Sequence, residues 1–219
     1  MLQKDESRMG DTVGVNDWVR MLRTAAEKVS AATSLLTQLD SVIGDGDHGT
    51  TMSRAMALVV KAVAEVQGRD PKTLLTDVGW ALMGVDGGAS GPLLGTLMIG
   101  VAEGIGDRQV LDASALATAF ESGLAALQKQ SKAQVGDKTM MDALVPAVAA
   151  LRAAADAGDD VGAAMAKVAA AAEQGAESTK PLRARFGRAR NLGDRSIGSQ
   201  DPGATSLSIL IRGMAEALA

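Results

Sequence analysis

Apolar residues recur every three or four positions along almost the whole chain, and this spacing constrains the fold more than any other feature. Residues 18–39, WVRMLRTAAEKVSAATSLLTQL, show the pattern clearly. Such spacing places apolar side chains on one face of an α-helix, whereas a half-buried strand needs strict alternation. No segment alternates in that way, and alanine-rich runs favour helix over sheet. The sequence therefore predicts an all-α protein.

Eight segments carry this helical pattern. They are residues 18–39, 52–67, 71–83, 92–105, 112–132, 138–157, 160–180 and 203–219. Pro146 lies inside the sixth segment and is expected to kink it. No linker divides the segments, so we expect a single domain over residues 13–219, preceded by a mobile tail over residues 1–12.

The connections between the expected helices are of two kinds, which alternate along the chain. Three are short and ordinary: GRDP, GDRQVL and AGDD. The other four are rich in glycine, aspartate or arginine, and they span residues 40–49, 85–91, 133–138 and 181–203. Because short loops favour antiparallel neighbouring helices, alternate connections should lie at the same end. We therefore expect the four unusual loops to form one site.

Composition excludes several other classes of protein. The 219 residues are 47% hydrophobic and include no cysteine, which excludes a disulfide framework, a thiolate zinc site and a cysteine nucleophile. A net charge of −4 without a long basic tract argues against nucleic acid as a partner. The N-terminus is charged where a signal peptide would be apolar, and no long uncharged run could span a membrane. We therefore expect a cytoplasmic protein.

The loop DSVIGDGDHG has the residue types of a metal site. Asp40, Asp45 and Asp47 would repel one another unless a cation or hydrogen-bond donors hold them together. Carboxylates suit Mg²⁺ or Ca²⁺, and their spacing here is not that of an EF-hand. A single aspartate at such a place would usually be a helix cap. Three of them between glycines predict a Mg²⁺ site, and Mg²⁺ leaves coordination positions open for the phosphates of a nucleotide.

Three glycine-containing segments, HGTTM, DGGASGP and DPGATS, lead into expected helices. Helix N-termini carry unpaired N–H groups and a positive dipole end, and so bind anions. Neither a Walker A motif nor a strand-preceded GxGxxG is present, which excludes a P-loop and a Rossmann site. Each segment alone would be a plain turn. Three at the same end as the aspartates indicate a phosphate-binding site.

The longest loop, PLRARFGRARNLGDRSIGSQDPG, carries five arginines. Most are expected to be solvated, while one or two could neutralise charge during phosphoryl transfer. His48, the single histidine, could act as a general base, carry a phosphoryl group or position the nucleotide, and positioning is the simplest role directly after Asp47. Met140 and Met141 are expected close enough to this end to contact a base.

With these motifs assembled, the chain resembles the nucleotide-binding L subunit of dihydroxyacetone kinases and the C-terminal domain of the single-chain, ATP-dependent enzymes. The resemblance runs from about residue 15 to the end and rests on LDSVIGDGDHGTTM, GGASGPLLGT, GDKTMMDALVP and GRARNLGDRSIGSQDPGATS. It implies a barrel of eight antiparallel amphipathic helices with the nucleotide at one end. The alternation of the loops agrees with that arrangement.

The resemblance also implies a set of site residues. Asp40, Asp45 and Asp47 would hold two Mg²⁺ ions that bridge the phosphates of ADP or ATP. Arg188 would reach the nucleotide from the long loop and stabilise charge during transfer. The other residues implied at the nucleotide are His48, Gly49, Thr50, Thr51, Ala89, Ser90, Gly136, Val145, Asp201, Pro202 and Gly203.

In that family a separate K subunit holds the ketose covalently. The resemblance therefore implies a phosphotransferase subunit that acts on dihydroxyacetone or a related small ketose only with such a partner, docked at the nucleotide end. In one branch ADP stays bound and is rephosphorylated by an M subunit, whereas in the other ATP exchanges. The sequence leaves both branches, a homodimer and the identity of the ketose open. Two other hypotheses remain: a nucleotide-loaded regulatory module, and a kinase subunit for another partner-held acceptor, such as a fatty acid.

Overall fold

The computed structural model describes residues 11–64 and 68–219. Residues 1–10 of the expected tail and the last three residues of the expected helix at 52–67 lie outside the described residues. The described part is mostly helical, as predicted, and its one small sheet pairs the two-residue strands β1 (Val13–Gly14) and β2 (Val110–Leu111) in antiparallel fashion. The helices are α1 (Val15–Ala31), α2 (Thr33–Ile43), α3 (His48–Ala64), α4 (Pro71–Met83), α5 (Ser90–Ile105), α6 (Ala113–Gln130), α7 (Met141–Asp156), α8 (Val161–Ser178), the 3-10 helix η1 (Arg188–Ser196) and α9 (Pro202–Glu216).

The first expected helix, residues 18–39, is two helices in the structure. α1 ends at Ala31 and α2 begins at Thr33, with Ala32 between them at φ −88° and ψ 7°. The Thr33 hydroxyl donates to the carbonyl of Ser30 at 2.6 Å, which provides a partner at a helix end. Beyond this break α2 packs against α3, α9 and η1. The predicted total of eight helices was too low, because the described residues form nine α-helices and one 3-10 helix.

The helices other than α2 and η1 pack in a closed order. α1 packs against α3, each later helix packs against the next in the sequence, and α9 returns to α1. Their inward faces form one core, in which Trp18 of α1 stacks on Phe120 of α6 with ring centroids 6.3 Å apart. Within the described residues, every helix is too short or too polar to cross a membrane.

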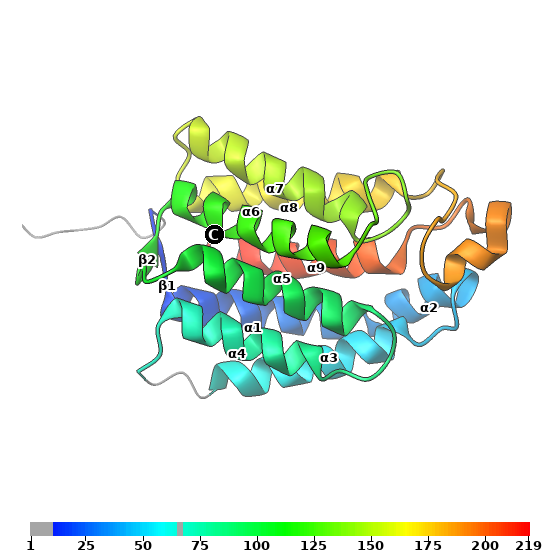
Figure 1. Cartoon of the computed structure of the whole chain (residues 1–219), viewed down its shortest axis with the longest axis horizontal. Coiled ribbons are helices and arrows are strands. Elements are labelled where there is room, and N and C mark those ends of the chain that lie inside the picture. Colours follow the sequence, from blue (N-terminus) through cyan, green and yellow to red (C-terminus); the bar gives the residue numbers. More distant parts are fainter. Residues whose placement is uncertain (1–10, 65–67) are drawn as a thin grey trace, which may run out of the picture.

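The helices run along the long axis of the molecule, so their connections gather at two ends (Figure 1). β1 and β2 lie at one end. The loops that precede α3, α5, α7 and α9 lie at the other, together with α2 and η1. The predicted meeting of the four unusual loops is confirmed, because adjacent helices in the closed order run in opposite directions.

Pro146 lies inside α7, which continues through it from Met141 to Asp156, and the expected kink stays a prediction. The proline ring lacks the N–H that would bond to the carbonyl of Asp142 four residues earlier. That carbonyl faces α8, where a Cβ on Gly175 would lie 2.1 Å from it. The close approach of α7 and α8 therefore depends on a glycine.

Candidate functional site

The turn between α2 and α3 brings Asp40, Asp45 and Asp47 together. Asp40 lies in the last turn of α2, and Asp47 immediately precedes α3. A Cβ on Gly44 would lie 2.1 Å from Asp40 Oδ1, so glycine is required for the backbone to pass this close to the carboxylate. Gly46 has a φ of +79°, a backbone conformation that residues other than glycine rarely adopt.

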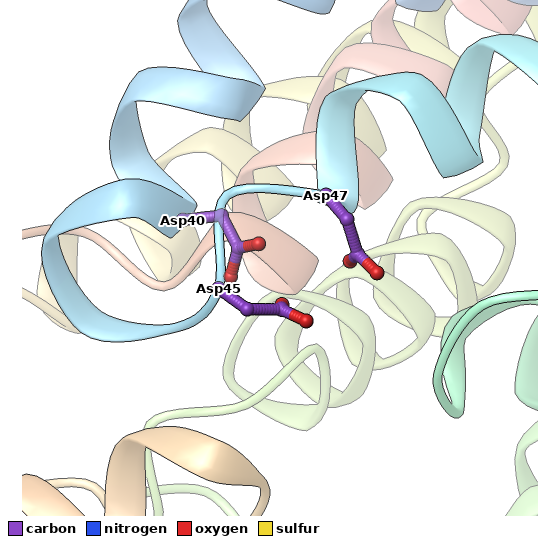
Figure 2. Close-up of side chains that lie close together, drawn as sticks. All are labelled: Asp40, Asp45 and Asp47. Atoms are coloured by element: carbon purple, nitrogen blue, oxygen red, sulfur yellow. The ribbon is translucent and has the colours of Figure 1, made fainter.

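The three carboxylates converge, as the sequence predicts (Figure 2). One oxygen of each lies within 4.8 Å of the others, and no other group of three or more acidic or histidine side chains with such spacing occurs in the part of the chain that the structure describes. Asp40 is buried and accepts a hydrogen bond from His48 N at 3.1 Å. Asp45 is exposed and forms an ion pair with Arg188.

This donor set fits a hard divalent cation. Its ligand atoms are carboxylate oxygens, which Mg²⁺ and Ca²⁺ prefer. Three negative charges at this separation repel one another, and the single guanidinium of Arg188 offsets only part of that repulsion. A divalent cation among Asp40, Asp45 and Asp47 would offset the remainder.

A cavity of about 650 Å³ opens beside the acidic cluster. Its lining comes from all four of the loops that the sequence predicts at one end. The three helices that follow the glycine-containing segments begin at it, because His48 of α3, Ser90 of α5 and Pro202 of α9 are in the lining. Since helix N-termini favour anions, the cavity combines a candidate cation site with three helix ends that can bind anions.

His48 makes contacts through both ring nitrogens. Nε2 lies 2.9 Å from Ser206 Oγ, and Nδ1 lies 3.4 Å from Ser90 Oγ. The Ser206 hydroxyl donates its single hydrogen to the carbonyl of Gly203 at 3.1 Å, so it accepts a hydrogen bond from the ring. This pattern favours the Nε2–H tautomer, with Nδ1 accepting from Ser90.

Burial shifts the pKa values of three groups around the cavity. It lowers the pKa of His48, although the charge of Asp40 opposes the shift. It raises the pKa of Asp201 to about 7, although a hydrogen bond from Ala204 N and the charge of Lys138 oppose it. Burial also lowers the pKa of Lys138, against the attraction of nearby carboxylates.

The cavity has an apolar wall formed by Leu93, Leu127, Ala133, Met140 and Met141. These residues come from α5, α6, α7 and the loop between α6 and α7. Aliphatic and thioether side chains can lie against a flat apolar group such as a nucleobase. The predicted proximity of Met140 and Met141 to this end is confirmed.

Most of the predicted site residues line the cavity: Asp40, Asp45, Asp47, His48, Ala89, Ser90, Arg188, Asp201, Pro202 and Gly203. The lining does not include Gly49, Thr50, Thr51, Gly136 or Val145. Gly49 faces α2, where a Cβ would lie 2.2 Å from the carbonyl of Thr33. Thr51 accepts a hydrogen bond from Arg54 at 3.1 Å, and Gly136 N donates to Asp142 Oδ1 at 2.6 Å. Val145 packs against the core.

The site also involves residues to which the sequence motifs assign no particular role. Lys138 is buried within GDKTMM, and Phe186 lies in the arginine-rich loop. Ser206 supports His48 from the second turn of α9. The sequence motifs included all three positions, but nothing in their spacing indicates that a lysine is buried or that a serine meets a histidine 158 residues away.

Comparisons with known proteins agree with this geometry. The family described as the DAK2 domain matches residues 42–216. The chain is 39% identical over 197 residues to the Escherichia coli (strain K12) protein named PEP-dependent dihydroxyacetone kinase, ADP-binding subunit DhaL, covering 90% of this chain and 94% of that protein. It is 38% identical over 199 residues to the Listeria innocua protein named PEP-dependent dihydroxyacetone kinase 1, ADP-binding subunit DhaL, with the same coverage of 90% and 94%.

The fold is also similar to a solved structure, the dihydroxyacetone kinase from C. freundii in complex with AMP-PNP and Mg²⁺. The TM-score is 0.71 and the sequence identity 25%, and the match covers 99% of this chain. It covers 36% of the C. freundii chain, so the present chain spans little more than a third of that enzyme.

Proposed function

Because this chain belongs to the DAK2-domain family, we propose that it is the nucleotide-binding subunit of a dihydroxyacetone kinase. One observation carries the proposal: three carboxylates within 4.8 Å of one another border a cavity at which the three helices that follow glycine-containing segments begin. Carboxylates bind a divalent cation and helix N-termini bind anions. A magnesium-bound nucleotide supplies both charges in one ligand.

The nucleotide phosphates would lie between the acidic cluster and the starts of α5 and α9. Ala89 and Ser90 would contact them from α5, and Pro202 and Gly203 from α9, where Asp201 caps the helix by accepting from Ala204 N at 2.7 Å. The base would lie against the apolar wall. This placement is supported by the lining of the cavity, which contains these residues.

Asp40, Asp45 and Asp47 would hold the Mg²⁺, and two ions are proposed, as the resemblance implies. Bound Mg²⁺ neutralises phosphate charge while the terminal phosphoryl group is transferred. Arg188, which forms an ion pair with Asp45, would offset part of the same charge. His48 would orient the turn and the start of α5, since both of its ring nitrogens are engaged.

The acceptor, dihydroxyacetone or a related small ketose, would be held by a K-type partner subunit docked at the cavity end. Three segments that border the cavity carry large exposed apolar side chains: Val42 in α2, Val135 in the loop before α7, and Ile197 just after η1. An apolar patch within a polar rim is typical of protein interfaces, and these side chains would contribute to such a patch. The names of the two bacterial relatives further support the branch in which ADP stays bound and an M-type subunit rephosphorylates it.

We also propose that residues 13–219 form one nucleotide-binding domain with the architecture of an eight-helix barrel. The closed packing order of α1 and α3–α9 supports this. A cytoplasmic location remains a prediction.

Calorimetric titration with ADP in the presence of Mg²⁺ tests the proposal. Asp45→Asn should weaken binding by about 30-fold or more, because losing one partner of a charge pair costs about 2–5 kcal/mol. The control is Asp107→Asn, which changes an exposed aspartate in the turn after α5, away from the cavity lining. Unchanged tight binding in Asp45→Asn would refute the metal site.

Turnover distinguishes a kinase subunit from a regulatory module with the same site. The chain alone should show no activity with dihydroxyacetone and ATP. Activity should appear when a purified K-type subunit is added together with an M-type subunit and its phosphoryl donor. Nucleotide binding without turnover of any small ketose in that mixture would favour the regulatory module.

A further inference from the structure

The arginine loop, residues 179–201 between α8 and α9, is held together internally. The buried Ser196 hydroxyl accepts from Ala184 N at 2.9 Å and donates to the carbonyl of Gly193 at 2.7 Å. Arg183 and Asp194 form an ion pair at 3.4 Å. These contacts join the two halves of the loop, so the loop is expected to move as one piece about its base.

The base of the loop is closed by two contacts between its ends. Gly198 N donates to the carbonyl of Lys180 at 2.8 Å, and Asp201 N donates to Thr179 Oγ1 at 2.9 Å. The carbonyls of Thr179 and Ser199 also lie on opposite sides of this base. A single hydrogen-bond donor that contacts both carbonyls would connect the start of the loop to its end.

Lys138 supplies that donor from a different part of the chain. Its ammonium donates to the carbonyl of Thr179 at 2.6 Å and also to the carbonyl of Ser199. The preceding residue, Asp137, holds the same loop at a second place: its carbonyl accepts from Arg185 N at 3.1 Å, and its carboxylate pairs with the Arg185 guanidinium at 3.4 Å. Two consecutive residues therefore fasten the arginine loop to the loop before α7.

Both the burial of the Lys138 side chain and the conformation of its backbone are energetically unfavourable. It is 1% exposed, and a buried ammonium requires hydrogen-bond partners. It has a φ of 61°, and it is the one non-glycine residue with positive φ among residues 11–64 and 68–219. Strained backbone of this kind tends to occur where function requires it. A lysine kept under both constraints indicates that its ammonium is needed where it lies.

We propose that Lys138 is a positioning residue that clasps the base of the arginine loop and so sets how long a bound nucleotide stays in the cavity. The second half of this statement rests on the proposed function. Phe186 and Arg188 of the loop line the cavity, so a nucleotide beneath them leaves when the loop lifts. Contacts within the loop hold its two halves together. If the contacts at its base are lost, Phe186 and Arg188 are therefore expected to move away from the cavity together.

Hydrogen–deuterium exchange of the full chain without ligand tests the clasp. Lys138→Met keeps an unbranched side chain, one heavy atom shorter than that of lysine, but removes both hydrogen bonds. It should accelerate amide exchange in residues 183–197 by about tenfold or more. Lys138→Gln keeps one shorter uncharged donor and should fall between Lys138→Met and the wild type.

Lys180→Met is the matched control. Lys180 is at the same loop base, but its ammonium pairs with Glu177 at the surface while its backbone carbonyl makes the loop contact. Amide exchange in residues 183–197 of the Lys180→Met variant should match that of the wild type. Exchange in Lys138→Met that is no faster than in this control, or that rises equally in every helix, would overturn the clasp.

The effect on residence time is tested by the release rate of labelled ADP. The complex is formed with Mg²⁺, and release is followed after excess unlabelled nucleotide is added. Lys138→Met should release ADP at least about tenfold faster, with Lys138→Gln intermediate, while Lys180→Met keeps the wild-type rate. An unchanged release rate together with faster loop exchange would overturn the link to residence time. Failure of the wild type to bind ADP would refute the proposed function instead, and exchange would still decide the clasp.

Discussion

At the scale of single residues, His48 connects the acidic turn to the rest of the cavity. Its backbone N–H donates to the Asp40 carboxylate, while its ring contacts Ser90 at the start of α5 and Ser206 in α9. One residue therefore ties together three elements that are distant in sequence. Of the three roles that the sequence leaves open for His48, this geometry favours positioning, because carrying a phosphoryl group would require breaking a ring contact.

In the metal-free chain, the pKa of His48 is predicted to lie below its usual value of 6.5, because burial disfavours the charged ring. Nitrogen-15 NMR can follow it without ambiguity, since the sequence contains one histidine. At neutral pH the spectrum should report the Nε2–H tautomer. The contribution of His48 to the unfolding free energy should fall as pH drops below 6.5, because the unfolded chain binds the proton more readily. Asp201, whose pKa is raised to about 7, contributes in the opposite direction over this range.

Ser206→Ala should disturb this tautomer, because it removes the acceptor of Nε2–H. The exposed Ser114→Ala on α6 should leave the spectrum unchanged. A His48 pKa at or above 6.5 would contradict the effect of burial on this side chain. An Nδ1–H tautomer in the wild type would contradict the hydrogen-bond assignment.

At the scale of elements, glycines set how closely neighbouring helices approach. A Cβ on Gly213 of α9 would lie 2.5 Å from Ala25 Cα of α1, and one on Gly175 of α8 would lie 2.1 Å from the carbonyl of Asp142 in α7. The second contact also bears on the cavity. The Asp142 carboxylate accepts from Gly136 N and Thr139 N at 2.6 and 2.8 Å, and so shapes the loop that carries Lys138.

Gly175→Ala is predicted to lower the unfolding free energy by about 1–3 kcal/mol, because the added methyl group would overpack the contact between α7 and α8. Gly162→Ala in the same helix is the control. Its Cβ would meet nothing closer than 3.4 Å, so it should raise stability by about 0.4–1 kcal/mol through the unfolded state. Urea unfolding of both variants measures the difference. Equal stability of Gly175→Ala and the wild type would mean that α7 and α8 are packed less closely than described.

At the scale of the whole molecule, the cavity joins segments from Asp40 to Gly203. Each loop comes from a different pair of helices, so no single segment contains the site. A ligand that contacts all four loops binds only the folded chain. Binding and global stability are therefore linked.

ADP with Mg²⁺ is predicted to raise the midpoint of thermal unfolding by about 5–10 °C at a hundredfold excess over Kd. This range follows from about 2.7 kcal/mol of linkage and about 2–4 °C per kcal/mol for a domain of this size. A thermal shift assay with and without EDTA measures it. Chelation should remove most of the shift, because the acidic cluster would then repel the phosphates. An equal shift in EDTA would show that the cation is not part of the site.

The prediction of the site from sequence succeeded where local signals were sufficient. Asp40, Asp45 and Asp47 are close in sequence and separated by glycines, so their convergence depends on one turn. The meeting of the four loops followed from the alternation of helix directions. The break at Ala32 was missed because its neighbours suit a continuous helix, and it results from packing of α2 against α3 and η1.

The amino-acid sequence alone determined the all-α class, the convergence of the acidic turn and the end of the molecule at which the four loops meet. These features depend on helical periodicity and on residues close in sequence. Only the tertiary structure decided that Lys138 is buried beneath the arginine loop, that His48 meets Ser206, and that Met140 rather than Val145 lines the cavity. These outcomes depend on which side chains lose contact with water when distant segments pack, and the local pattern of a sequence does not specify that packing.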